Sequence, residues 1–384
     1  MKILAVSLLR LGDILMTSGV LRALKEKNPG SELHLLINRQ FGGVSRLLIG
    51  VDKIIFFDRD RAQRGMGEFE HPLFDSYDYF KEFIEELNAN DYAQVYNFSQ
   101  NLFSARLMGL LDCPIKVGMT IDMNDKATFG SEWFEKLNRR NLGEPVHYID
   151  YMARGCGVSP VSANPSVQIS NSRVNKFFQK KYIAIQALTN EEKKNWGIGS
   201  WAQMVRFVAR KDPSLDFVFL AAPSEEAILI PEVQNLKDSG VRAEICVCDL
   251  SEAAAILESA ELVITGDTSI KHLATAVDAK VLELSLGSSD FHFTGTYSDK
   301  SYIYQGNVAC APCSPGGSCS QKRKYCAESI HPHTVSQIAL AILNNEDLRY
   351  FENLYRGKFL ANGLWTAELD QENEAYDVGV IREL

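Results

Sequence analysis

The sequence predicts an α/β protein built from two doubly wound units in tandem. Short apolar runs alternate with amphipathic helical patterns, this alternation occurs twice, and a Ser-, Pro- and Asn-rich segment at residues 159–172 separates the two series. Alternating strands and helices form a parallel sheet that helices cover on both faces. Such sheets bind ligands beyond the carboxyl ends of their strands, so the loops after strands are the first candidates for function.

The first series contains five apolar runs that we expect to form strands, ILAVSLL (3–9), ELHLLIN (32–38), KIIFF (53–57), QVYNF (94–98) and IKVGM (115–119). A helix is expected over residues 13–27, because its apolar residues recur on one face and the chain then reaches the stop signal Asn-Pro-Gly. A second helix is expected over residues 77–88.

The second series contains the expected strands YIAIQAL (182–188), FVFLAA (217–222), EICVCD (244–249), ELVITGD (261–267) and KVLELSL (280–286). Helices are expected over residues 200–210, over residues 251–259 and in a segment that includes His272. A last helical stretch is expected over residues 346–360, before a polar, acidic end. The predicted domains are therefore residues 1–165, residues 166–345, and a C-terminal helix with a tail at residues 346–384.

Composition excludes several classes of protein. The 384 residues are 46% hydrophobic and 23% charged, as in a globular protein with real cores, and the net charge of −9 disfavours general nucleic-acid binding. No apolar stretch approaches the roughly 20 residues of a membrane span. The N-terminus lacks the features of a signal peptide, so a cytoplasmic protein is expected. No G-x-G-x-x-G follows the first strand, which disfavours a dinucleotide-dependent oxidoreductase.

Two loops of the second series carry candidate anion-binding residues. The first is QALTNEEKKNWGIGSW (186–201), which contains Thr189, Lys193 and Lys194. Its lysines could neutralise a diphosphate leaving group, or they could belong to a charged run that is exposed to solvent. In ITGDTSIKHLA (264–274), Thr268 or Ser269 could cap a helix whose N-terminus binds an anion. Lys271 would then either contact that anion or be an exposed lysine.

The stretch RLGDILMTSGVLRAL (10–24) raises the same kind of choice for Asp13. Asp13 could be a helix N-cap, or it could be a general base beside a substrate that Gly12 allows to approach the backbone closely. The positive end of a helix would keep this carboxylate ionised near neutral pH.

Several motifs, in order along the chain, resemble the bacterial ADP-heptose glycosyltransferases, the lipopolysaccharide heptosyltransferases of glycosyltransferase family 9. ITGDTSIKHLA resembles their D-T-G-x-x-H-L-A loop, KNW (194–196) their K-x-W element, and LLRLGDILMTSGVLRAL their R-x-G-D-x-L motif. Residues 91–119 are similar to their Y-D-x-x-x-D-x-Q segment, with Asn97 in place of the acidic residue. The cysteine-bearing stretch from residue 310 resembles a loop near their C-terminus, and the whole resemblance covers residues 1 to about 345.

The resemblance implies a GT-B fold with two Rossmann-like domains around a cleft, the acceptor on the first domain and the nucleotide sugar on the second. It implies transfer of a heptose from ADP-heptose, with inversion and no catalytic metal, to an acceptor such as the lipopolysaccharide core at the inner face of the inner membrane. Asp13 would be the base, with Lys194 of the other domain, or its neighbour Lys193, and Thr189 on the donor phosphates. The other donor-site residues that it implies would be Glu225, Asp267, Thr268 and His272, and the helix N-terminus described above adds Ser269 and Lys271 to the predicted donor site.

The chain departs from the family pattern at two places. Ser269 and Ile270 replace the glycine and its neighbour in the D-T-G-x motif, and SLGSSDFHF (285–293) stands where the family has F-G-P-T-D-P. A different sugar, a protein acceptor, or an inactive protein that only binds nucleotide sugars are therefore alternatives.

Two further groups of residues are candidates. Arg59, Arg61 and Arg64 follow a predicted strand and suit an anionic acceptor, although they could also be a solvated charged loop. The thiols of Cys310, Cys313, Cys319 and Cys326 have the chemistry of a tetrathiolate site. A structural zinc or iron ion is one interpretation of these cysteines, and four free thiols is the other.

Overall fold

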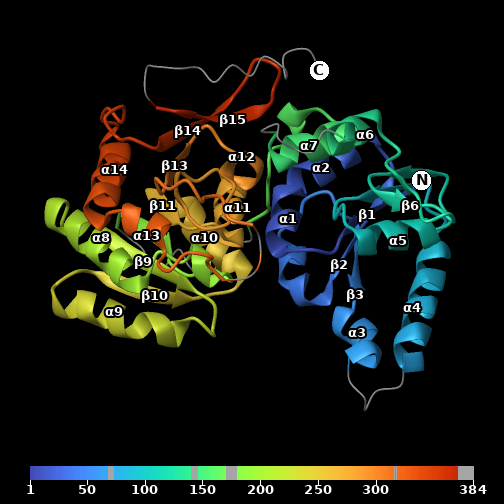
Figure 1. Ribbon diagram of the computed structural model, residues 1–384, viewed down its shortest axis with the longest axis horizontal. Helices are drawn as coiled ribbons and strands as arrows, with labels where there is room; N and C mark the ends of the chain where they lie inside the picture. Colours follow the sequence, from blue (N-terminus) through green and yellow to red (C-terminus); the bar gives the residue numbers. More distant parts are fainter. Residues whose placement is uncertain (68–72, 140–145, 170–179, 315, 317, 371–384) are drawn as a thin grey trace. The chain divides into compact units, whose positions relative to one another are not determined.

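The computed structural model describes residues 1–67, 73–139, 146–169, 180–314, 316 and 318–370 (Figure 1). It divides into two compact units, Met1–Gln168 and Ile169–Leu384. Each unit has its own parallel sheet and its own hydrophobic core.

All five strands predicted for the first series form one parallel sheet in the order β3-β2-β1-β4-β5. Its strands are β1 (Lys2–Ser7), β2 (Glu32–Asn38), β3 (Lys53–Phe57), β4 (Gln94–Asn97) and β5 (Ile115–Val117). The strand order changes direction between β1 and β4. The loops after these two strands therefore lie at the topological switch point, where doubly wound sheets bind ligands.

Helices cover both faces of this sheet. They are α1 (Leu11–Met16), α2 (Ser18–Lys27), α3 (Arg59–Gly67), α4 (Leu73–Asn88), α5 (Leu102–Leu110), α6 (Glu132–Arg139) and α7 (Tyr148–Gly155). Short 3-10 helices span Arg39–Arg46 and Pro160–Ala163, and a small hairpin pairs β6 (Thr120–Ile121) with β7 (Ala127–Thr128). Side chains of α4 and α5 pack with β1 and β3 in one apolar cluster.

The single helix predicted over residues 13–27 is divided in two at Thr17. The Thr17 hydroxyl donates to the carbonyl oxygen of Asp13 at 2.7 Å, and the residue has φ −86° and ψ 3°. A threonine that bonds back to the preceding turn commonly bends a helix, which explains the break between α1 and α2.

The segment predicted as a linker belongs in part to the first unit. Residues Pro160 and Ala163 are buried, and the segment packs on α2 and α7. Val167 forms an antiparallel bridge with Leu48. Residues 170–172 of the predicted linker lie outside the described residues.

The second unit has an eight-stranded sheet in the order β10-β9-β8-β11-β12-β13-β14-β15. Its strands are β8 (Tyr182–Gln186), β9 (Asp216–Ala221), β10 (Ala243–Val247), β11 (Leu262–Thr265), β12 (Val281–Ser285), β13 (Ser301–Gln305), β14 (Leu354–Phe359) and β15 (Trp365–Leu369). The first six are parallel, and the last two add an antiparallel hairpin. The switch point of this sheet lies between β8 and β11.

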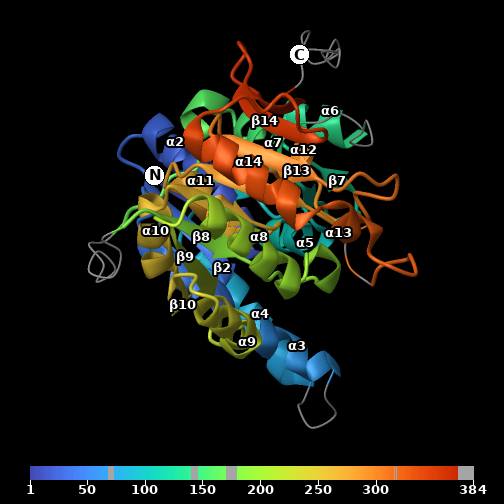
Figure 2. The ribbon, with the colours of Figure 1, turned by 90° about the vertical axis from the view of Figure 1, so that its left-hand side faces the viewer.

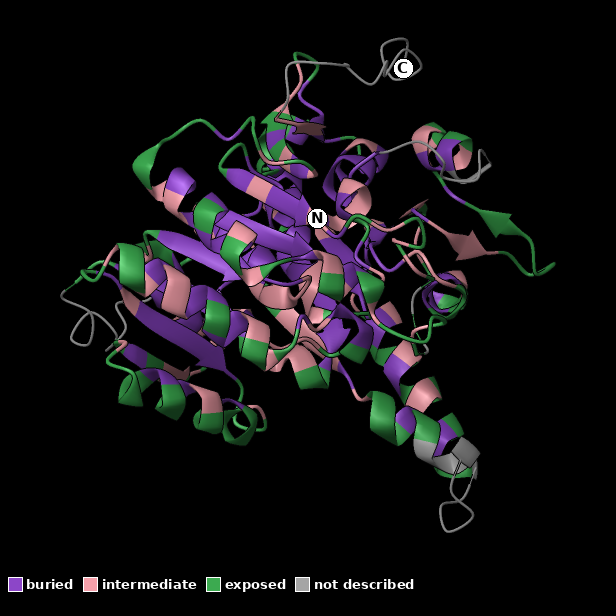
Figure 3. Ribbon diagram, turned by 60° about the vertical axis from the view of Figure 1, so that its left-hand side comes forward, coloured by how far each residue is buried: buried purple, intermediate pink, exposed green. Residues whose placement is uncertain are grey.

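The helices of the second unit are α8 (Ile198–Lys211), α9 (Glu226–Asp238), α10 (Leu250–Ser259), α11 (Ser269–Ala276), α12 (Phe291–Thr294), α13 (Tyr325–Ser329) and α14 (Pro332–Asn344), with a 3-10 turn at Glu192–Lys194. Residues of α8, α9 and α14 share one apolar cluster with the strands. Figure 2 shows α8 and α14 side by side over this sheet. The strands beneath them are buried, and Figure 3 draws them in purple.

The C-terminal helix predicted over residues 346–360 is wrong, because this stretch contributes β14. Gly357 of β14 lies so close to the sheet that a Cβ there would be 2.2 Å from the carbonyl oxygen of Ser298. Trp365 of β15 donates from Nε1 to the same oxygen at 3.2 Å. The hairpin satisfies the outer edge of β13, and a helix could not pair with that edge.

Within the described ranges, no helix combines the length and the apolar character needed to span a bilayer.

The contact of α2 with the chain at residues 163–164 depends on a glycine. We expect Gly19→Ala to lower the midpoint of thermal unfolding, because a Cβ at Gly19 would lie 2.1 Å from the carbonyl oxygens of Ala163 and Asn164. Overpacking of this kind costs about 1–3 kcal/mol. The control is Gly199→Ala in α8, where nothing lies within 4 Å of the added atom and alanine is the better helix former. Equal effects of the two variants would contradict the close approach.

Candidate functional site

In the second unit, the loop after β8 buries both of its lysines. Lys194 has 10% of its side-chain surface exposed, and its Nζ lies 2.8 Å from Asp267 Oδ2 and 3.3 Å from Glu191 Oε1. The interpretation of this stretch as a solvated charged run is therefore wrong. Its predicted neighbour Thr189 donates from its hydroxyl to the Glu191 carbonyl at 2.8 Å, which closes the loop.

The structure separates the two adjacent lysines by their partners. Lys193 Nζ donates to the carbonyl oxygen of Ser314 at 2.7 Å and also to that of Gly316, so it is bound to the cysteine-bearing loop. Gly287 packs on the Lys193 main chain, where a Cβ would lie 2.6 Å from the carbonyl oxygen. Lys194, in contrast, faces the loop after β11. Of the two, Lys194 is the one at the switch point with a side chain directed at the predicted donor loop.

The loop after β11 brings Asp267 between two lysines. Thr268 is the N-cap of α11 and accepts from the backbone N–H of Ile270 at 3.2 Å. Ser269 is the first residue of α11 and is half-buried. Asp267 Oδ2 pairs with Lys194, and its Oδ1 lies 2.6 Å from Lys271 Nζ. The two switch-point loops thus meet through one carboxylate.

Lys271 is not the exposed lysine of one prediction, because its side chain is completely buried. Its Nζ contacts two carboxylates, and a contact with a donor anion stays a prediction. The second carboxylate is Glu283 of β12, whose Oε1 lies 2.7 Å from Lys271 Nζ. Sequence reasoning missed Glu283, although it is the one charged residue within the apolar run VLELSL.

Electrostatics keep this buried group ionised. Burial by itself would raise the pKa of Asp267, but attraction to Lys271 and Lys194 outweighs burial and holds that pKa well below its usual value. Burial would likewise lower the pKa of Lys271, but Asp267 and Glu283 raise it above the ordinary lysine value. Asp267 and Lys271 are therefore both charged at neutral pH.

The other predicted donor residues lie on the same unit. His272 of α11 is buried. Glu225 comes directly before α9, and its carboxylate accepts from the backbone N–H of Ala222 at 2.9 Å, so it closes the turn after β9.

In the first unit, Asp13 follows β1 at the switch point. Arg10 occupies the N-cap position of α1 and Asp13 is the third residue of that helix, so Asp13 is not the N-cap. Gly12 precedes it in the first turn and both residues are half-buried. The negative charge of Asp13, after burial, contributes to raising the pKa of the Tyr148 phenol, which places the two residues near each other. Sequence reasoning missed Tyr148, whose hydroxyl donates to the Phe98 carbonyl at the end of β4.

The predicted arginines belong to helix α3 and not to a loop. The Arg61 guanidinium lies over the Tyr79 ring, 4.7 Å from its centroid, and Arg59 donates to Gln63. The side chain of Arg64 lies outside the described residues. A pocket of about 260 Å³ at the carboxyl ends of β2 and β3 is lined by Asn38, Arg39, Gln40, Asp58, Arg59 and Asp60. Arg39, which sequence reasoning missed, pairs there with Asp58 at 3.5 Å.

The four clustered cysteines lie in the segment that runs from β13 into α13, and their binding of zinc or iron stays a prediction. Burial and the neighbouring thiols Cys310, Cys326 and Cys319 raise the pKa of Cys313, so the four residues are near one another. However, no three His, Cys, Asp or Glu side chains in the described ranges are arranged to hold a metal ion. Cys313 and Cys319 instead donate to carbonyl groups of their own loop. The loop is attached through Lys193 and through the bond from the Cys313 N–H to the Gly287 carbonyl, at 2.8 Å.

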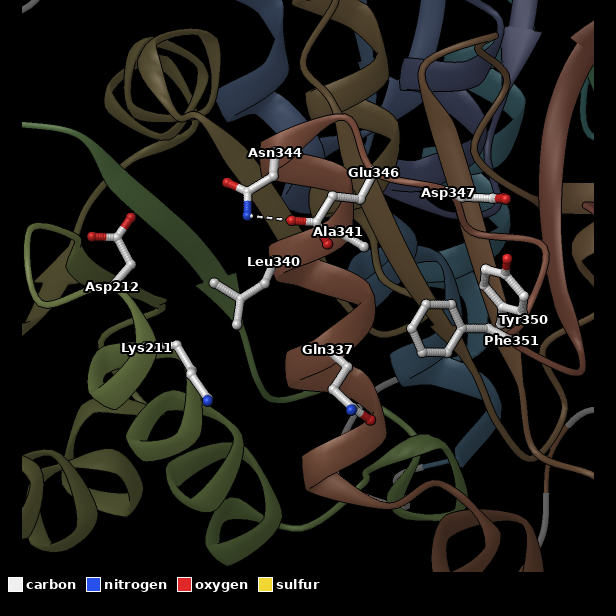
Figure 4. A pocket seen from close by; sticks show the side chains of 10 residues that line it. All are labelled: Lys211, Asp212, Gln337, Leu340, Ala341, Asn344, Glu346, Asp347, Tyr350 and Phe351. Atoms are coloured by element: carbon white, nitrogen blue, oxygen red, sulfur yellow. Dashed lines mark hydrogen bonds between the residues drawn. The ribbon is translucent and has the colours of Figure 1, made fainter.

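A larger pocket of about 710 Å³ lies elsewhere in the second unit (Figure 4). It is lined by the C-terminal ends of α8 and α14 and by residues that follow α14, including Lys211, Gln337 and Tyr350. The end of α8 leads into β9, so the pocket lies at the amino edge of the sheet. None of the predicted site residues lines it.

The fold defines the class of protein first. Two doubly wound units, each with candidate residues at the switch point of its sheet, form the architecture of the GT-B glycosyltransferases. The model of Glycosyltransferase family 9 (heptosyltransferase) matches residues 80–323. The chain belongs to this family, which confirms the resemblance seen in its motifs.

Solved structures share this fold at low sequence identity. The glycosyl transferase family 9 protein from Veillonella parvula DSM 2008 has a TM-score of 0.67 and 17% identity, over 90% of this chain and 97% of that one. The E. coli ADP-heptose lps heptosyltransferase II has a TM-score of 0.64 and 16% identity, over 90% of this chain and 99% of that one. E. coli heptosyltransferase WaaC with ADP-2-deoxy-2-fluoro heptose has a TM-score of 0.59 and 18% identity, over 88% of this chain and 99% of that one. No curated protein sequence matches the chain.

The depressed pKa of Asp267 predicts a pH-dependent effect of Asp267→Asn on stability. A carboxyl group with a lowered pKa in the folded state stabilises the protein above its unfolded value of about 3.9, and this contribution is lost as pH falls through the folded value. The asparagine of the variant does not ionise, so its stability lacks this dependence on pH. Urea unfolding should therefore show the largest difference between wild type and variant near pH 7, with the difference shrinking as pH falls below about 4. A difference that grows at acid pH would contradict the charged assignment.

Proposed function

We propose that the chain transfers a heptose from ADP-heptose to a cell-envelope glycan such as the lipopolysaccharide inner core. Membership of family 9 makes it a glycosyltransferase of the heptosyltransferase type. The donor is suggested by two proteins of similar fold, one named an ADP-heptose lps heptosyltransferase and the other solved with ADP-2-deoxy-2-fluoro heptose.

The position of Lys194 is the observation that carries this proposal. Its ammonium group lies at the β8–β11 switch point, and Asp267 holds it at 2.8 Å. A diphosphate leaving group gains negative charge as its bond to the sugar breaks, and a positioned cation stabilises that charge. Lys194 thus supplies in the proposed reaction the positive charge that a metal ion supplies in other transferases.

Asp13 is the proposed general base of the transfer. Its carboxylate accepts the proton of the acceptor hydroxyl while the hydroxyl oxygen forms a bond to the anomeric carbon. The bond from that carbon to the donor diphosphate breaks, and the diphosphate leaves with the electron pair on the face opposite the attack. The configuration at the anomeric carbon is therefore inverted. The place of Asp13 in the first turn of α1 favours its ionised form.

The acceptor is assigned to the carboxyl edge of the first sheet. Arg59 lines the pocket beyond β2 and β3, and Arg61 follows it on α3. Guanidinium groups bind phosphate and carboxylate in a bidentate manner, which suits an anionic glycan.

Asp13→Asn is expected to lower kcat at least about 100-fold, in line with the usual contribution of a general base. The variant should keep the unfolding midpoint and the ADP affinity of wild type, because the amide has almost the same shape. Transfer is measured with purified ADP-heptose and a heptose-free core acceptor, and the exposed Asp112→Asn of the same unit is the control. Full transfer by Asp13→Asn would remove this residue from the mechanism. Wild-type protein that binds ADP-heptose without transferring it would favour the alternative of an inactive binding protein.

Replacing Arg59 and Arg61 together by serine should raise the KM for the acceptor at low salt and leave the KM for the donor unchanged. The effect should shrink as salt screens the acceptor charge. Arg106→Ser, an exposed arginine on α5, is the matched control. An acceptor KM that stays at the wild-type value in the double variant would refute the assignment.

A further inference from the structure

The second unit contains an unbroken row of opposite charges, which we name the charge chain. It runs from Glu191 through Lys194, Asp267 and Lys271 to Glu283, with successive N–O distances of 3.3, 2.8, 2.6 and 2.7 Å. Exposure of the side chains falls from 23% at Glu191 to zero at Lys271 and Glu283. One end of the charge chain thus reaches the proposed donor site and the other is fixed in the interior.

The inner end is held by the fold. Glu283 lies on β12, and its Oε2 accepts from the backbone N–H of Thr296 at 3.0 Å and from the Thr296 hydroxyl at 2.8 Å. Its Oε1 accepts from the Ser289 hydroxyl at 3.4 Å and from Lys271. Both carboxylate oxygens therefore have partners, which fixes the orientation of the group.

Stability alone does not account for this buried pair. Apolar residues of similar volume at positions 271 and 283 would fill the same space without the desolvation that two buried charges require. What the Lys271–Glu283 pair adds is a fixed orientation of the Asp267 carboxylate and a change in the electric field around it. Lys271 takes Oδ1 of Asp267 and leaves Oδ2 for Lys194, so the carboxylate has one orientation.

Lys271 also changes how much charge Lys194 can offer to an anion. A carboxylate 2.8 Å from Lys194 would by itself cancel much of the positive charge of that lysine. Lys271, 2.6 Å from the other oxygen, offsets part of the charge of Asp267, while Glu283 in turn offsets part of the charge of Lys271. Asp267 therefore orients Lys194 and cancels less of its field than an unpaired carboxylate would.

We infer that Lys271 and Glu283 are positioning residues for the donor, which hold Asp267, and through it the Lys194 ammonium group, where a nucleoside diphosphate binds. This inference rests on the proposed function of Lys194. The motif resemblance assigns no role to Glu283, and the helix-terminus argument from the sequence offered Lys271 only as a contact of the donor anion itself.

The test uses ADP as the probe and the double variant Lys271→Met/Glu283→Gln, which leaves no unpaired buried charge. Titration calorimetry should show ADP bound at least tenfold more weakly than by wild type. In a Lys194→Met/Asp267→Asn background, where no carboxylate at position 267 loses its lysines, the same double change should have almost no further effect, because it acts through Lys194. The matched control is Lys237→Met/Glu244→Gln, which removes a Lys–Glu pair with the same 2.8 Å N–O distance elsewhere in the unit and should leave ADP binding unchanged.

Each result decides the matter. An unchanged ADP affinity in Lys271→Met/Glu283→Gln would overturn the inference, and so would equal weakening with and without Lys194, since that is a merely structural effect. If Lys194→Met itself binds ADP as wild type does, the proposed contact of Lys194 with the donor diphosphate fails and the inference fails with it, whereas the transfer assay above tests the proposed function separately. If the double variant does not fold, the ADP affinity of Thr296→Val is measured in its place, because this change removes only the hydroxyl that orients Glu283.

In Thr296→Val, a two- to threefold weaker affinity for ADP supports the inference, and an unchanged affinity overturns it.

Discussion

The contact of Asp267 with two lysines is the interaction on which the rest of the site depends. It joins the loop after β8 to the loop after β11 through Lys194, and it joins both to the interior through Lys271. An isolated carboxylate in this place would be costly to bury and would take up a proton. With a lysine on each oxygen it stays ionised, and the two loops have one relative arrangement. The donor-side chemistry proposed above follows from that arrangement.

Both units use the same physical principle to position functional groups. Their sheets change strand order at β1–β4 and at β8–β11, and at each change two adjacent loops diverge to opposite faces and leave room for side chains. Asp13 occupies the first of these places and Lys194 the second. The two groups have opposite charges and suit the opposite tasks proposed for them, uptake of a proton by Asp13 and stabilisation of a leaving anion by Lys194.

The sequence predicted the strands of both parallel sheets except β13, because runs such as ELHLLIN and FVFLAA are mainly apolar and are buried along most of their length. It failed at the C-terminal hairpin, where the partner of β14 is a strand edge about 50 residues away, and pairing with that edge overrode the local helical pattern. The motif residues Asp13, Lys194 and Asp267 follow β1, β8 and β11, the strands at the switch points of the two sheets. The burial of Lys271 was not predictable from its helix alone, because the group that makes it possible, Glu283, lies on another element and reads locally as a strand residue.

A crystal structure of the chain with ADP tests the central claim most directly. The account predicts phosphate oxygens within hydrogen-bond distance of Lys194 Nζ, with the contacts from Asp267 to Lys271 and from Lys271 to Glu283 intact. A diphosphate bound where Lys194 does not touch it, or bound with Lys194 released from Asp267, would contradict the account.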